Sequence, residues 1–164
     1  MTISVFPSKF IGLFLLIFCL QSAAYSQQVT LLSIDELNKR TATGKDTTYI
    51  INFWATWCAP CVKELQYFEK LGADLKAEKL KVLLVNVDFK SKLKSTVIPF
   101  VKRRKLKSEV YLLNETDPDV YINRIDKTWT GSIPATLFMK NGKRVFSENE
   151  YNYKQLLNAY KNIQ

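Results

Sequence analysis

Apolar residues along the chain follow two different spacings, which predict strands that alternate with helices. Short runs rich in β-branched and aromatic residues are typical of buried strands, whereas apolar residues three or four positions apart are typical of one helix face. Strands are expected at residues 29–32, 47–55, 81–89, 109–113, 135–139 and 144–147. Helices are expected at residues 34–40, 58–75, 97–106, 118–125 and 153–163.

The order of these elements predicts an α/β fold. Strands and helices alternate first, and then two strands joined at Asn141-Gly142 form a hairpin before the last helix. Ser33 and Glu36 form a capping box at the start of the first helix. We therefore expect a central mixed β-sheet flanked by helices on both faces.

The first 26 residues have the pattern of a secretory signal peptide. Lys9 precedes an apolar run, Phe10–Leu20, and small residues follow at 21–26. That run is short for a membrane span, which needs about 20 apolar residues. We expect a signal peptide at 1–26 and one domain at 27–164. A retained membrane anchor and lipidation at Cys19 are the alternatives.

The amino-acid composition narrows the classes of catalysis that the chain can perform. The chain has 164 residues, 47% of them hydrophobic, which is enough for one domain with a core. It contains no histidine, so catalysis by imidazole and every Ser-His or Cys-His arrangement are excluded. Whatever the chain does must depend on other groups.

Removal of residues 1–26 leaves Cys58 and Cys61 as the two cysteines of the chain. A disulfide between them closes a very small loop, which constrains the unfolded chain little. Redox chemistry and metal binding are the remaining explanations. A structural zinc site needs further cysteine or histidine ligands, and the mature sequence has none, so we expect no metal.

The position of the pair favours redox chemistry. Cys58 follows a buried strand and begins a helix, where unpaired backbone N–H groups favour thiolate and lower the cysteine pKa from about 8.5 toward 7. Cys61 lies one turn further into the helix and is expected to be more buried. We predict that Cys58 is the nucleophile and Cys61 the resolving thiol.

Two motifs resemble the thioredoxin superfamily. Phe53-Trp-Ala-Thr-Trp-Cys58-Ala-Pro-Cys61 is similar to its active site, and Gly131-Ser-Ile-Pro134-Ala-Thr is similar to its cis-proline loop. The similarity covers residues 27–164. Asn52 and Glu64 favour the exported TlpA/ResA-like reductases within that superfamily.

The resemblance implies a thioredoxin-like fold and further site residues. Pro134 is expected to be cis, and Ile133 to offer its backbone to a substrate peptide. Glu64 is expected to relay protons to Cys61, or else to be an ordinary exposed helix residue. Trp57 is expected to cover the disulfide and shape the substrate groove, or else simply to pack. No cofactor beyond the Cys58–Cys61 disulfide is implied.

The formal net charge is +9, and basic residues are concentrated between Lys90 and Lys107, where no Asp or Glu occurs. This segment is either a solvated face or a surface for anionic lipid headgroups or an acidic partner. The charge is not accompanied by a nucleic-acid recognition motif, so nucleic acid is not expected as a partner.

These features together predict an exported thiol–disulfide oxidoreductase that reduces disulfides of periplasmic or other extracytoplasmic proteins. The resemblance implies a membrane-embedded thiol carrier as electron donor, and we expect a monomer. A dithiol oxidase or isomerase, a thioredoxin-fold binding module without turnover, and a thiol peroxidase are the alternatives.

Overall fold

A computed structural model of the chain describes residues 28–44 and 46–164. The predicted signal peptide at 1–26, which includes Cys19, lies outside these described residues. None of the described helices combines the length and the apolar character that a bilayer span requires.

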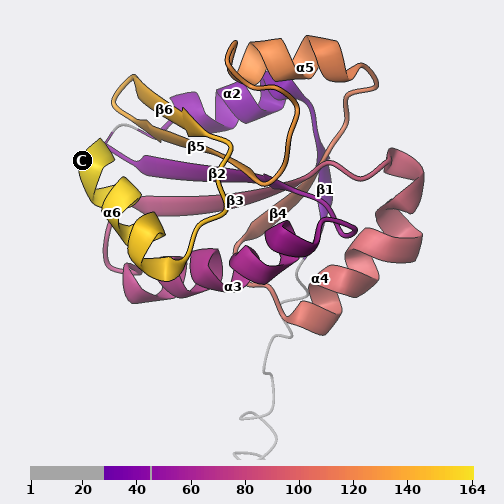
Figure 1. The fold of residues 1–164 in the computed structure, drawn as a ribbon, viewed down its shortest axis with the longest axis horizontal. Helices are drawn as coiled ribbons and strands as arrows, with labels where there is room; N and C mark the ends of the chain where they lie inside the picture. The colour runs from indigo at the N-terminus through magenta and orange to yellow at the C-terminus, as the bar shows by residue number, and fades with distance from the viewer. Residues whose placement is uncertain (1–27, 45) are drawn as a thin grey trace, which may run out of the picture.

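Six strands form one mixed sheet in the order β1-β4-β3-β2-β5-β6. The first four in this order run parallel, and β5 and β6 are antiparallel to their neighbours. This arrangement confirms the predicted mixed sheet, with the fully buried strand β2 near its centre (Figure 1). The strands are β1 (Thr30–Leu32), β2 (Thr48–Trp54), β3 (Leu80–Asn86), β4 (Glu109–Leu113), β5 (Ala135–Lys140) and β6 (Lys143–Ser147).

Helices cover both faces of the sheet, as the pattern predicts. In Figure 1, α2 and α5 lie on one side of the strands, and α3, α4 and α6 lie on the other. Strand β2 supplies both cores, because alternate side chains point to opposite faces: Ile50 and Trp54 belong to one buried cluster, Ile51 and Phe53 to the other. The helices are α2 (Ile34–Ala42), α3 (Ala59–Asp74), α4 (Ile98–Arg104), α5 (Pro118–Ile125) and α6 (Tyr153–Ile163).

Two segments differ from the prediction. Strand β3 ends at Asn86 instead of continuing to Phe89. The Asp88 backbone N–H donates to Asn86 Oδ1 at 3.0 Å and is therefore not paired with a neighbouring strand. The residues before α4 form a 3₁₀ turn, η3 (Lys90–Lys92), and a π turn, η4 (Leu93–Val97), which the apolar spacing did not reveal.

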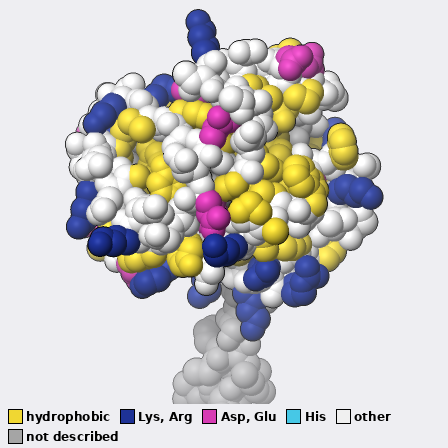
Figure 2. All heavy atoms as spheres, viewed as in Figure 1, with side chains coloured by type: hydrophobic (Ala, Val, Ile, Leu, Met, Phe, Trp, Pro, Cys, Tyr) yellow, Lys and Arg dark blue, Asp and Glu magenta, His cyan; other side chains and the backbone are white. Residues whose placement is uncertain are grey.

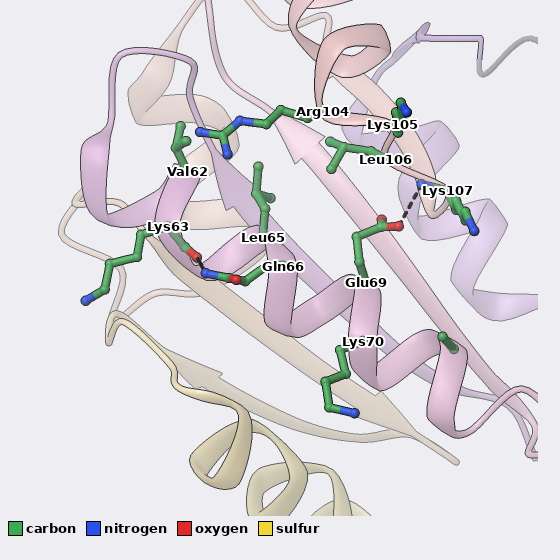
Figure 3. A pocket seen from close by; sticks show the side chains of 11 residues that line it. Val62, Lys63, Leu65, Gln66, Glu69, Lys70, Arg104, Lys105, Leu106 and Lys107 are labelled. Atoms are coloured by element: carbon green, nitrogen blue, oxygen red, sulfur yellow. Dashed lines mark hydrogen bonds between the residues drawn. The ribbon is translucent and has the colours of Figure 1, made fainter.

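Glu69 fastens the loop between α4 and β4 to helix α3. Its carboxylate accepts the backbone N–H groups of Lys107 at 2.7 Å and Ser108 at 3.0 Å. Figure 3 shows this side chain reaching across the hollow between α3 and the end of α4. The contact helps to hold α4, and the basic segment with it, against α3.

We expect Glu69→Ala to lower the free energy of unfolding by about 2 kcal/mol, because two backbone N–H groups lose a charged acceptor. The matched control is Gln66→Ala on the same helix, whose amide bonds only to the Lys63 carbonyl of that helix. Urea denaturation measures the free energy of unfolding of both variants. Equal losses in the two variants would contradict the tethering role.

Candidate functional site

The two cysteines lie where β2 leads into α3. Cys58 is the N-cap residue of α3, and its Sγ accepts the backbone N–H of Cys61 at 3.3 Å. The two form a disulfide with their Cα atoms 5.3 Å apart. Cys58 is 5% exposed and Cys61 is wholly buried. The more accessible sulfur therefore faces the positive end of the helix, which stabilises a thiolate there once the disulfide is reduced.

The loop before β5 lies against this pair. The Ile133–Pro134 peptide bond is cis. The carbonyl oxygen of Ile133 is 3.7 Å from Cys58 Sγ, and Pro134 is buried. The structure thus brings the cysteine pair and the loop containing Pro134 together, although more than seventy residues separate the pair from that loop in the sequence.

Trp129 holds that loop in place. Its ring packs on Phe53 of β2 with centroids 4.9 Å apart, and its Nε1–H donates to the Ser132 carbonyl at 2.8 Å. Gly131 has a φ of +92°, a conformation that glycine adopts without strain. A glycine and a buried tryptophan therefore position the backbone beside Cys58.

Trp57 lies on the rim of the site. Its side chain is 70% exposed, and it lines one hollow together with Phe89 and Ile133. An indole that is this exposed contributes little to the core. Its apolar surface remains open to a bound chain next to Cys58.

Glu64 is fully buried, so the alternative of an ordinary exposed helix glutamate is wrong. Asn52 Nδ2 donates to Oε1 at 2.8 Å, and the Tyr151 backbone N–H donates to Oε2 at 2.7 Å. The same Asn52 amide donates to Thr136 Oγ1 at 3.2 Å. Residues from β2, β5 and the turn before α6 thus surround a carboxyl group one turn after Cys61.

Burial raises the pKa of Glu64 from 4.5 to about 7, because the charged carboxylate is separated from water. The hydrogen bonds from the Tyr151 N–H and the Asn52 amide oppose this shift, and the nearby charge of Glu150 adds to it. The carboxyl group can therefore take up or release a proton near neutral pH. A proton-relay role for Glu64 remains a prediction.

Asp88 belongs to the site and was missed from the sequence. Its carboxylate accepts the Thr56 N–H at 2.8 Å, the Thr56 Oγ1–H at 2.9 Å and the Asn86 Nδ2–H at 2.8 Å. It ties the end of β3 to the turn before Cys58. The polar residues at 86 and 88, directly after an apolar run, are the sequence signal for it.

The assembled groups are suited to thiol exchange. A nucleophilic sulfur, a buried second sulfur, a backbone carbonyl beside the first and a carboxyl group with a pKa near 7 lie together. Across residues 28–44 and 46–164, no three histidine, cysteine, aspartate or glutamate side chains converge on a point where a metal ion could bind.

Comparison with known protein families identifies the family of this chain. Residues 21–141 match the model of the AhpC/TSA family. The chain belongs to the AhpC/TSA family. Among curated members of related groups, the thiol-disulfide oxidoreductase ResA of Geobacillus kaustophilus is 31% identical over 94 residues, which cover 57% of this chain and 49% of that protein. The chain thus spans about half the length of this curated relative.

Solved structures agree on the fold. A thioredoxin-related protein from Neisseria meningitidis serogroup B superposes with a TM-score of 0.63 at 23% identity, over 74% of this chain and 88% of that one. StoA from Bacillus subtilis gives 0.55 at 23% identity, over 70% and 83%. The predicted thioredoxin-like α/β fold is confirmed.

Glu64→Gln tests the buried carboxyl group. The folded pKa of about 7 lies above the unfolded value of 4.5, so protonated Glu64 adds stability that is complete below pH 4.5 and is lost as the pH rises through 7. Relative to Glu64→Gln, the unfolding free energy of the wild type should fall by about 3 kcal/mol over that interval. Urea denaturation at several pH values measures this change in unfolding free energy, and Glu69→Gln is the control. If the unfolding free energies of the wild type and Glu64→Gln change with pH in the same way, the raised pKa of Glu64 is ruled out.

Asp88→Asn should lower the free energy of unfolding by about 2 kcal/mol and accelerate hydrogen exchange at the Thr56 amide, because a buried charged acceptor is lost. Asp126→Asn is the matched control, since Asp126 makes the same two bonds to Thr128 in an exposed turn. If Asp88→Asn lowers the free energy of unfolding no more than Asp126→Asn does, Asp88 does not stabilise the site.

Proposed function

We propose that the chain is a thiol–disulfide oxidoreductase that reduces disulfides of proteins outside the cytoplasm. One observation carries the proposal: the Cys58–Cys61 pair caps α3 with Cys58 Sγ 3.7 Å from the Ile133 carbonyl. Membership of the AhpC/TSA family and similarity to proteins named thiol-disulfide oxidoreductase support it.

The reduced pair transfers two electrons to the client. The Cys58 thiolate attacks one sulfur of the client disulfide, a Cys58–client bond forms, and the other client sulfur leaves as a thiolate. The Cys61 thiolate then attacks Cys58 Sγ and releases the first client sulfur. The client becomes a dithiol after taking up two protons, and Cys58–Cys61 becomes the disulfide.

Glu64 serves the second step. Cys61 is wholly buried and must lose its proton before it attacks, and the carboxyl group one turn further along α3 is the neighbouring acid–base group with a pKa of about 7. The Ile133 backbone and the exposed Trp57 ring serve as the surface on which the client chain lies.

The reducing direction rests on the residues between the cysteines. Ala59 and Pro60 offer no charged or histidine group that would stabilise the Cys58 thiolate further, and less stabilisation of the reduced form favours a reductant. The oxidised pair is then returned to the dithiol by an electron donor, for which a membrane thiol carrier is the proposed partner. Export depends on the pattern at 1–26.

With reduced wild-type protein we expect catalysed reduction of insulin disulfides, and loss of this activity to background in Cys58→Ser, because the attacking sulfur is gone. Cys61→Ser should instead accumulate a mixed disulfide between Cys58 and the client, visible on a non-reducing gel. Equal activity in wild type and Cys58→Ser would contradict the proposal.

Two further readouts separate the alternatives. Equilibration with glutathione gives the reduction potential, and a value at or above about −180 mV would indicate an oxidase or isomerase. Peroxide consumption that depends on Cys58 and exceeds disulfide reduction would indicate a peroxidase.

A further inference from the structure

Trp57 lines two hollows, and a basic side chain lines each of them as well. One is lined by Trp57, Phe89, Lys90 and Ile133, among others. The other lies between Trp57 and Arg103, over Ser95 and Pro99. A chain that crosses Cys58 past the indole therefore passes Lys90 on one side or Arg103 on the other.

The segment that joins the two hollows has a basic residue at every second position from Lys90 to Lys94. Ser91 lines the first hollow and Ser95 lines the second, and Lys92 and Lys94 lie between them. We call Lys90, Lys92, Lys94 and Arg103 the basic strip. All four are exposed, and the ion pairs among the described residues involve none of them.

No acidic residue lies between Asp88 and Glu109 in the sequence. In Figure 2, dark blue side chains lie along the right and lower edges of the region that Figure 1 assigns to α4 and the turns before it, with no magenta among them. Of the basic strip, Arg103 also contacts the Phe100 ring, 5.5 Å from its centroid, which leaves the guanidinium accessible on its outer side.

The carboxylates near the first hollow, Asp88 and Glu115, form no ion pair with this strip among the described residues. Asp88 already accepts three hydrogen bonds from Thr56 and Asn86, and Glu115 accepts the backbone N–H of Ile34 at 2.8 Å. Asp117 and Asp119 lie at the start of α5, whose Pro118, Tyr121 and Ile122 line that hollow. Basic residues therefore border the approach to Cys58 on the α4 side, and acidic residues border it at Asp88 and near the start of α5.

Building on the proposed function, we propose that the basic strip selects client proteins whose chain carries Asp or Glu within a few residues of the disulfide that Cys58 attacks. Opposite charges accelerate encounter and orient the client before exchange. Hollows on both sides of an exposed indole suit an extended peptide, which can enter them, better than a bilayer surface, which reaches only protruding groups.

The test uses three synthetic peptides of equal length, each closed by one internal disulfide and flanked by Glu, Gln or Lys. The second-order rate of reduction by the pre-reduced protein is followed by stopped flow through tryptophan fluorescence. At an ionic strength of about 20 mM the Glu peptide should react about tenfold faster than the Gln peptide, and the Lys peptide should react slowest. High salt should remove the differences, because it screens exposed charges.

The variant Lys90→Gln/Lys92→Gln/Lys94→Gln/Arg103→Gln should bring the Glu-to-Gln rate ratio to about one. The matched control removes the same charge from exposed lysines at the other end of the sheet, and it should keep the wild-type ratio. The control positions are Lys76, Lys79, Lys81 and Lys161.

The outcomes distinguish the two proposals. If the wild type reduces none of the peptides, the proposed function fails. If it reduces all three at equal rates at low salt, the function stands and charge selection is overturned. Equal peptide rates combined with strip-dependent sedimentation on vesicles containing about one-third phosphatidylglycerol would assign the strip to lipid, and would likewise overturn the proposal.

Discussion

The site depends on the unpaired backbone N–H groups at the start of α3. Cys58 caps these groups with its sulfur, and the same sulfur faces the Ile133 carbonyl on the opposite side. The positive end of the helix favours the thiolate of a reduced Cys58, and the Ile133 carbonyl lies against the sulfur from a second loop. The remaining features of the fold hold these two backbone segments at that distance.

Three separate anchors hold the redox site and the basic segment in place. Asp88 fixes the turn before Cys58, Trp129 fixes the loop before Pro134, and Glu69 fixes the loop that follows α4. Each anchor joins segments that are far apart in sequence or belong to different elements. The site is therefore a product of the packed domain, and the cysteine motif alone does not define its shape.

The same distinction explains what the sequence could reveal. Local signals were sufficient for the capping box at Ser33 and for the hairpin at Asn141-Gly142, whose φ values of 48° and 82° suit a tight two-residue turn. The contact between Asp88 and Thr56 spans 32 positions, and no periodicity records it. The burial of Glu64 was equally hidden, because its partners Asn52 and Tyr151 come from other elements.

The hydrogen bond from the Tyr151 amide to Glu64 has a consequence for the C-terminal helix. Tyr151 lies next to Asn152, the N-cap residue of α6, and its N–H is one of the two donors that stabilise the ionised carboxylate. The pKa of Glu64, one turn after Cys61, therefore depends on whether α6 is docked against the sheet. An isolated peptide containing α3 would keep both cysteines and the glutamate, but it would lose the environment that tunes the carboxyl group. The C-terminal helix is in this sense a component of the redox centre, although it contributes no sulfur and no charge to it.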